Sequence, residues 1–204
     1  MASISKTTLR KAFDAYRKAL APVPHGARSR RICARAQVHP ALHRADVVHL
    51  YWPALDRGEV DTRPLIGWCQ AAGKTVVLPV VTSFVAGQPD MEARTFTDPD
   101  ALVENQWGLR EPIDGPRVAP SAIDLVIVPA FGVDRRGHRI GHGGGFYDRF
   151  LADLNNADTL ALAFDACLVD TVPSDDHDVP VQYVVTETET VGPLLPRPKQ
   201  PRLP

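Results

Sequence analysis

A glycine-rich loop preceded by basic residues is the part of this chain whose residue types and spacing could do chemistry. Four of the five residues at positions 141–145 are glycine, and Arg135, Arg136, His138 and Arg139 come shortly before them. Glycines allow successive backbone N–H groups to turn toward one point, and arginines supply full positive charges. A helix predicted to begin at the end of the loop adds a partial positive charge. Such a loop can surround an anion, and we expect this anion to be a nucleotide triphosphate.

An aspartate at the start of this helix could bind a metal ion beside the anion. Asp148 suits the helix dipole without any ligand, but next to phosphates its carboxylate could also hold Mg²⁺, which completes its shell with phosphate oxygens and water. The segment has no GxxxxGK[ST] pattern, and GHGGGF lacks the surroundings of a dinucleotide-binding GxGxxG motif. For the glycines alone, a tight strand-to-helix connection without a ligand is an equal alternative.

Length and composition are those of an ordinary globular protein. The 204 residues fit one domain, which we place at residues 1–190, followed by a tail at 191–204 whose five prolines predict an extended or disordered segment. A net charge of −1 argues against a general nucleic-acid or membrane-surface binder. The three cysteines form no CxxC pair, and no apolar run has the length of a signal peptide or membrane span. We therefore expect a cytoplasmic protein.

The hydrophobic pattern predicts which elements position the loop. A first helix follows the N-cap Ser5, with Leu9, Ala12, Phe13, Tyr16 and Leu20 on one face and Lys6, Arg10, Arg17 and Lys18 largely off it. Strands are expected at residues 47–51, 75–81, 92–96, 124–128, 159–164 and 183–185, and helices at residues 28–42, 62–72 and 145–154, with a turn of helix at 101–104. This alternation predicts an α/β fold with a mainly parallel sheet and helices on both faces. Ligands of such folds gather beyond the carboxyl ends of the strands, where the glycine loop lies.

The histidines offer a competing metal site. His39 and His43 are four residues apart and could face a metal from one helix, but with no third ligand in view we favour solvent-exposed side chains. His142 lies inside the glycine loop, where its ring could contact phosphate.

Several short motifs, in this order and spacing, resemble the 5-formyltetrahydrofolate cyclo-ligase family, whose enzymes are also called 5,10-methenyltetrahydrofolate synthetases. They are KTTLRK near the start, GEVDT at 58–62, GKTVVLP at 73–79, WGLREP at 107–112, the segment 124–150 with the glycine loop, HDVP at 177–180 and VVTE at 184–187. The resemblance implies a three-layer α/β/α fold similar to the NagB/RpiA/CoA-transferase-like fold. It also implies an ATP- and Mg²⁺-dependent ligase that converts 5-formyltetrahydrofolate to 5,10-methenyltetrahydrofolate and releases ADP and phosphate, as a monomer or small homo-oligomer.

The resemblance assigns roles to individual residues. Those similar to the family's ATP-binding residues are Lys6, Arg10, Arg139, Ile140, Gly141, His142, Gly143, Gly144, Gly145, Phe146 and Tyr147. Those similar to its folate-binding residues are Glu59, Trp107, His142, Gly143, Gly144, Gly145 and Phe146. Asp148 and Asp178 match the metal carboxylates, and Arg139 and Glu59 match catalytic positions. Tyr51 and Trp52 could line the same pocket.

Each assignment has a structural alternative. Lys6 and Arg10 could be solvated surface charges, Asp178 could form a turn, Glu59 could be a solvated loop residue, and Trp107 could be a core residue. The chain also departs from some family members, which have a lysine where Gly144 stands and a basic residue where Val80 stands. A noncatalytic nucleotide- or folate-binding paralogue is the alternative function.

The chemistry that the resemblance implies is activation of a formamide oxygen. The formyl oxygen attacks the γ-phosphate, N10 attacks the resulting iminium phosphate, and phosphate leaves. The protein then mainly positions the reactants and stabilises charge. We expect Arg139, Lys6 and the loop N–H groups to stabilise the phosphates, Asp148 and Asp178 to hold Mg²⁺, and Glu59 to orient the pterin.

Overall fold

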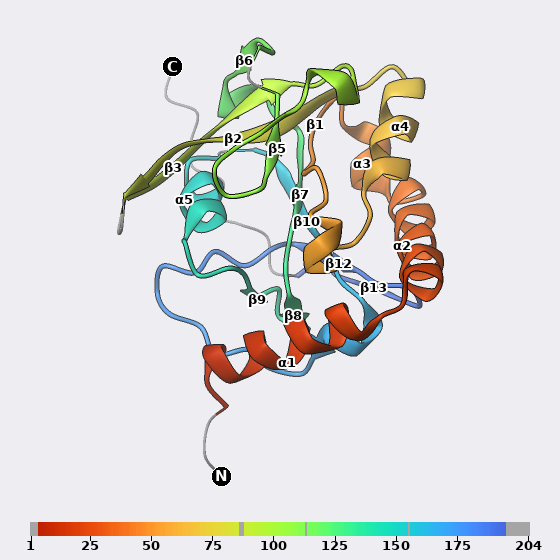
Figure 1. The fold of residues 1–204 in the computed structure, drawn as a ribbon, viewed down its shortest axis with the longest axis vertical. Coiled ribbons are helices and arrows are strands. Elements are labelled where there is room, and N and C mark those ends of the chain that lie inside the picture. The colour runs from red at the N-terminus through yellow and green to blue at the C-terminus, as the bar shows by residue number, and fades with distance from the viewer. Residues whose placement is uncertain (1–3, 86–87, 113, 155, 195–204) are drawn as a thin grey trace.

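A mainly parallel sheet organises the fold, as Figure 1 shows. The computed structural model describes residues 4–85, 88–112, 114–154 and 156–194. Within these residues the sheet has eight strands, in the order β13 (Thr190–Val191), β12 (Tyr183–Val185), β10 (Asp158–Leu162), β7 (Leu125–Val128), β1 (Val47–His49), β2 (Thr75–Val85), β3 (Gln88–Thr95) and β6 (Arg117–Val118). The five neighbouring strands from β12 to β2 are parallel to one another. The outer strands β13, β3 and β6 each pair with their inner neighbour in an antiparallel way.

Helices cover both faces of this sheet and make three layers. In β7, Leu125 and Ile127 face one core and Val126 and Val128 face the other, because successive side chains of a strand point to opposite faces. The first core also receives residues of α1 (Lys6–Ala19), α2 (Pro22–Gln37), α3 (Pro40–Arg44) and α4 (Arg63–Ala71), and the second receives those of α5 (Phe146–Ala152). Figure 1 shows α5 and the helices α2 to α4 on opposite sides of the sheet. The predicted α/β fold is confirmed.

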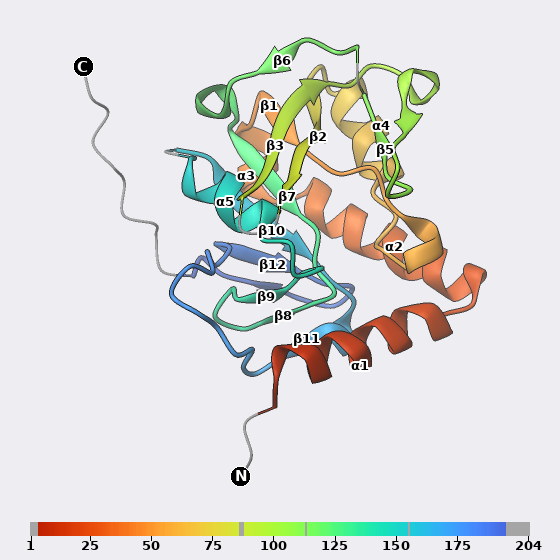
Figure 2. The ribbon, with the colours of Figure 1, turned by 60° about the vertical axis from the view of Figure 1, so that its left-hand side comes forward.

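Two smaller sheets and four short 3-10 helices complete the described residues. One sheet contains β11 (Leu168–Val169), β8 (Gly132–Asp134) and β9 (Arg139–Ile140), and the other contains β4 (Val103–Glu104) and β5 (Arg110–Glu111). The 3-10 helices are η1 (Leu55–Arg57), η2 (Pro99–Ala101), η3 (Pro120–Ala122) and η4 (Asp165–Cys167). Figure 2 shows α1 beside the sheet that contains β8 and β9. The basic residues before the glycines therefore belong to a β-hairpin of β8 and β9, which was not predicted from the sequence.

Helix boundaries are confirmed at some positions and corrected at others. Ser5 caps α1 by accepting a hydrogen bond from the Thr8 N–H. The predicted helix 28–42 is wrong: α2 begins earlier, at Pro22, and a second helix, α3, begins at Pro40, because the residue before a proline avoids the helical region. His39 stands at this break, buried, with its Nδ1 accepting from the Ala41 N–H, so it is not the solvated side chain that we expected.

Other corrections concern the region beyond α4. The predicted turn of helix at 101–104 is η2 followed by strand β4, and the predicted strand 92–96 is longer, as β3. Thr62 is the N-cap residue of α4 but makes no side-chain cap, whereas Asp61 Oδ1 accepts from the Arg63 N–H.

The three cysteines are core residues, and the chain after β12 returns to the edge of the sheet. Cys33, Cys69 and Cys167 are buried and free, and burial raises the pKa of each thiol to about 12. At the chain end, Val191 belongs to β13 and the Leu194 N–H donates to the Gln182 carbonyl, while residues 195–204 of the predicted tail lie outside the described residues. Among the described residues, no helix is long and apolar enough to cross a membrane.

Candidate active site

A single cleft brings the predicted site residues together at the carboxyl ends of β1 and β7. Its volume is about 600 Å³. The predicted residues that line it are Lys6, Arg10, Glu59, Trp107, Asp178 and all ten residues from 139 to 148. Tyr51 and Trp52, which follow β1, line it as predicted. The site is therefore assembled from five separate stretches of the chain.

The glycine loop crosses from β9 to α5 along one wall of the cleft. Gly143 and Gly145 have φ of 94° and 73°, a conformation that other residues adopt at a cost. Gly144 does not have a positive φ, and a Cβ there would lie 2.8 Å from the Phe146 ring. Arg10 Nε donates to the Gly141 carbonyl at 2.7 Å and ties the loop to α1.

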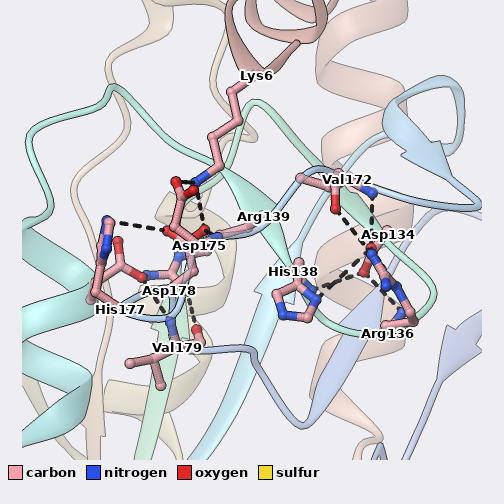
Figure 3. A network of polar contacts seen from close by, with 11 residues as sticks. Lys6, Asp134, Arg136, His138, Arg139, Val172, Asp175, His177, Asp178 and Val179 are labelled. Carbon is pink, nitrogen blue, oxygen red and sulfur yellow. Dashed lines mark hydrogen bonds and ion pairs between the residues drawn. The ribbon is translucent and has the colours of Figure 1, made fainter. Parts of the chain in front are cut away.

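Lys6 is held by two carboxylates at one end of the cleft, as Figure 3 shows. Its Nζ lies 2.6 Å from Asp175 Oδ2 and 2.5 Å from Asp178 Oδ2. Burial lowers the pKa of Lys6, but the hydrogen bonds and charges of the two aspartates together raise it more. The pKa of Asp178 is lowered, since the bonds from Lys6 and the Asp175 N–H outweigh the opposing effect of burial. Lys6 is thus an ion-paired side chain and not a free surface cation.

Arg139 and Asp148 form a second ion pair beside the first. Arg139 Nη2 donates to Asp148 Oδ1 at 2.8 Å, and its Nη1 donates to the Val179 carbonyl. The Val179 N–H also donates to Asp148 Oδ1, at 3.1 Å. Burial lowers the pKa of Arg139, while Asp148 and Asp178 act against this. Val179 therefore connects the two predicted metal carboxylates, because its N–H binds Asp148 and because it directly follows Asp178, beside which Figure 3 labels it.

The carboxylates of this region are a chemically suitable set for a divalent cation. One oxygen or nitrogen each of Asp175, His177 and Asp178 lie within 4.8 Å of one another. Asp148 Oδ2 and Asp178 Oδ1 accept no hydrogen bond within the described part of the chain. Carboxylate oxygens are the ligands that Mg²⁺ prefers, whereas the exposed imidazole of His177 suits it less. Sequence reasoning missed Asp175, although it lies three residues before Asp178.

Glu59 faces the glycine loop from the other wall. Its Oε2 accepts from the Ala54 N–H at 2.9 Å, and its Oε1 lies 3.5 Å from His142 Nε2. The side chain of Glu59 is 11% exposed. Its loop is held by Arg17, whose guanidinium donates to the carbonyls of Arg57 and Gly58 at 2.8 Å.

Arg17 itself is buried, so the prediction that it lies off the apolar face of α1 is wrong. Its Nη1 also reaches the Ala130 carbonyl at 3.3 Å, and its Cζ lies 4.4 Å from the centre of the Phe131 ring. The burial is tolerated because the carbonyl acceptors and the ring together solvate the charge.

Aromatic rings form a further part of the cleft wall. Phe84, near the end of β2, stacks on Trp107 with ring centres 4.3 Å apart and contacts Phe146 at 4.9 Å. Trp107 is partly exposed in the cleft, which does not fit a core residue. Sequence reasoning missed Phe84, because its position on a strand gives no signal of a neighbouring cleft.

Two arginines that we expected to face the anion point elsewhere. Arg135 pairs with Glu189 at 2.7 Å, and Arg136 pairs with the buried Asp134 at 2.9 Å. Asp134 also accepts from the N–H groups of Arg136, His138 and Val172, so it holds the β8–β9 hairpin together (Figure 3). Of the three arginines before the glycines, only Arg139 lines the cleft.

Comparisons with known proteins find one family. The model of the 5-formyltetrahydrofolate cyclo-ligase family matches residues 2–187. The 5-formyltetrahydrofolate cyclo-ligase of Escherichia coli strain K12 is 34% identical over 177 residues, which cover 85% of this chain and 95% of that one. The enzyme of the same name from Mycolicibacterium smegmatis is 38% identical over 117 residues, 56% of this chain and 60% of that one. The solved structure of Aquifex aeolicus 5,10-methenyltetrahydrofolate synthetase has a TM-score of 0.80 at 27% identity and covers 97% of both chains.

Proposed function

The chain belongs to the 5-formyltetrahydrofolate cyclo-ligase family, and we propose that it closes the methenyl ring with ATP as the phosphoryl donor and Mg²⁺ bound beside the phosphates. The observation that supports this most is the composition of the cleft. One part carries Arg10, Arg139 and the glycine loop, a surface suited to phosphates, and another part carries Glu59 and Trp107, a surface suited to a flat polar ring. One cavity would therefore suit both ligands of a phosphoryl transfer to folate.

The proposed reaction activates a poor leaving group. The formyl oxygen on N5 attacks the γ-phosphorus, the bond from that phosphorus to the bridging oxygen breaks, and ADP leaves. N10 then attacks the formyl carbon, the N10 proton is lost, and the C–O bond breaks to release phosphate and leave the methenyl bridge. In such reactions a protein contributes mainly position and electrostatic stabilisation.

The phosphate end would be served by groups that are already held in place. Arg10 is fixed by the Gly141 carbonyl of the loop, Arg139 by the Val179 carbonyl, and Lys6 by Asp175 and Asp178. Groups that need no reorganisation stabilise developing charge most effectively. Backbone N–H groups of residues 143–145 add neutral donors along the same wall, since positive φ at Gly143 and Gly145 turns the peptide planes.

Asp148 and Asp178 would hold the Mg²⁺ ion. Their free oxygens, Asp148 Oδ2 and Asp178 Oδ1, match the oxygen preference of this ion, which would neutralise phosphate charge when bound. Arg139 and the Val179 N–H orient Asp148 by occupying its other oxygen. Lys6 does the same for Asp178 and balances its charge.

The folate end would use Glu59 and the aromatic rings. A carboxylate accepts hydrogen bonds from the N–H groups of a pterin, and Oε1 of Glu59 faces His142 across the cleft. Trp107, backed by Phe84, offers a flat face to the ring.

A direct assay tests the proposal. The purified full chain is mixed with 5-formyltetrahydrofolate, ATP and Mg²⁺, and the methenyl chromophore is followed in the near ultraviolet while ADP is measured separately. We expect one ADP for each methenyl product and no product when either ATP or Mg²⁺ is omitted. Product formation without ATP, or ADP release without product, would overturn the proposed reaction.

A further inference from the structure

Two arginines on the cleft wall have no acidic partner. Arg57 and Arg110 both line the cleft, and in the described part of the chain neither forms an ion pair with a carboxylate. The acidic residue next to Arg110 in the sequence, Glu111, is buried, with its Oε1 accepting from the Val81 N–H, and Asp56, next to Arg57, forms no ion pair with it within the described residues. An unpaired cation at a substrate cleft is available to an anionic group of the ligand.

Each of these arginines is held by a carbonyl and keeps most of its donors free. Arg57 Nη2 donates to the Trp107 carbonyl at 2.5 Å. Arg110 Nη2 donates to the Pro99 carbonyl at 3.2 Å, and its Cζ lies 5.6 Å from the centre of the Trp52 ring. A guanidinium has five N–H donors, so one such bond leaves a face that can bind a carboxylate.

The loop that carries Arg57 contacts α1 far from Lys6. Lys6, which lies at that end, and Arg17, which binds the Arg57 carbonyl, are both on α1. They are eleven residues apart in sequence, and at 1.5 Å per residue this separates them by roughly 16 Å along the helix. The main chain at Arg57 is therefore held far along α1 from Lys6, beside which the nucleotide phosphates are expected.

We propose that Arg57 and Arg110 bind the carboxylates at the glutamate end of the folate substrate. This inference rests on the proposed function and extends it to the substrate's other end. With the pterin against Glu59 and Trp107, the aminobenzoyl group extends away from the reacting atoms and ends in a glutamate with two carboxylates. Arginines with free donors are suited to such groups. Arg110 lies beside the Trp52 ring, and Arg57 is held at the Trp107 main chain.

The experiment compares two ligands that differ only in the glutamate. Binding of 5-formyltetrahydrofolate and of 5-formyltetrahydropteroate, which lacks the glutamate, is measured by calorimetry on the full chain. The variants are Arg57→Met, Arg110→Met and the double variant, with Arg63→Met as the matched control, because Arg63 pairs with Asp61 and does not line the cleft. Arg57→Lys tests whether charge alone is sufficient.

We expect the wild type to prefer the glutamate-containing ligand by about tenfold or more, and this preference to fall by about tenfold in each single variant. A higher salt concentration should also weaken the preference for the glutamate-containing ligand, since salt screens the charges of solvent-accessible arginines. Equal weakening of both ligands would assign the arginines a structural role and overturn the proposal, as would a preference that survives in the double variant. If the wild type binds both ligands without preference, this inference fails while the proposed function stands; if it binds neither, the proposed function fails first.

Discussion

His142 Nε2 lies 3.5 Å from Glu59 Oε1, so the glycine loop meets the loop after β1 across the cleft. The two residues belong to opposite walls and are 83 positions apart in sequence. A shift of His142 in the glycine loop would therefore also change the surroundings of the Glu59 carboxylate, which is assigned to the pterin. The pair is partly exposed on the His142 side, at 50%, and shielded on the Glu59 side.

The first prediction concerns Glu59. Glu59→Gln should reduce the affinity for 5-formyltetrahydrofolate by about ten- to a hundredfold, the effect of losing a charged hydrogen bond. The affinity for a nonhydrolysable ATP analogue should be retained, because the phosphate groups are expected on the other wall. Glutamine can still accept from the Ala54 N–H, so the loop should keep its conformation.

Asp61→Asn is the matched control for this variant. Asp61 pairs with Arg63 at 2.7 Å and does not line the cleft. We expect its ligand affinities to equal those of the wild type in the same titrations. A Glu59→Gln protein that binds folate normally, or weakens both ligands alike, would remove Glu59 from the pterin site.

The second prediction concerns the metal carboxylate Asp148. Asp148→Asn should lower turnover by at least about a hundredfold, because the charge beside the phosphates is lost. Its Oδ1 can still accept from Arg139 and the Val179 N–H, so the fold and folate binding should remain. Turnover is measured over a range of Mg²⁺ concentrations, with Asp153→Asn at the end of α5 as control. Full activity of Asp148→Asn at limiting Mg²⁺ would contradict the assignment.

The sequence predicted the residues that line the cleft better than it predicted the short strands and irregular segments. The β7 strand and the glycine loop are local patterns, so they were found directly, whereas the β8–β9 hairpin was hidden because each of its strands is short. The polar face given to Arg17 was wrong, since its partners are carbonyls distant in sequence. Phe84 and Arg57 reach the cleft only through tertiary packing, which no local pattern reports.

The third prediction separates two neighbouring glycines. Gly143→Ala should raise the KM for ATP by up to about tenfold, because a φ of 94° is strained by roughly 1–2 kcal/mol in other residues. Gly144→Ala should instead act mainly on folate, since its methyl group would displace the Phe146 ring that packs against Phe84. Initial rates with each substrate varied in turn distinguish the two effects. Equal effects of both changes on ATP would mean that the loop responds as one unit.

The fourth prediction concerns the buried Arg17. Arg17→Met should lower the free energy of unfolding by about 2–4 kcal/mol, because three carbonyls lose a charged donor. It should also weaken folate binding, since the loop before Glu59 is no longer held. Lys18→Met, the neighbouring exposed residue with an ion pair to Asp14, should cost less than about 0.5 kcal/mol. Urea unfolding of both variants measures the difference, and similar losses would contradict the role given to Arg17.

The last prediction concerns the pH dependence of stability through His49. This residue lies in β1 beneath α5, fully buried, and neither ring nitrogen has a hydrogen-bond partner within the described residues. Tyr147 and Phe150 pack against its ring at 5.9 and 5.0 Å. Burial lowers its pKa to about 3.

A histidine with a lowered pKa binds protons more readily in the unfolded chain than in the folded protein. Between its unfolded pKa of about 6.5 and its folded pKa of about 3, the unfolded state is therefore favoured as the pH falls, by up to about 1.4 kcal/mol per pH unit. His49→Leu removes this term and also the two buried polar atoms, so it should be more stable than the wild type by about 1–3 kcal/mol at neutral pH. Urea unfolding of both proteins from pH 8 to pH 5 tests this: the advantage of the variant should be constant above about pH 7 and grow by about 2 kcal/mol at pH 5. A constant difference over the whole range would show that His49 is protonated equally in both states.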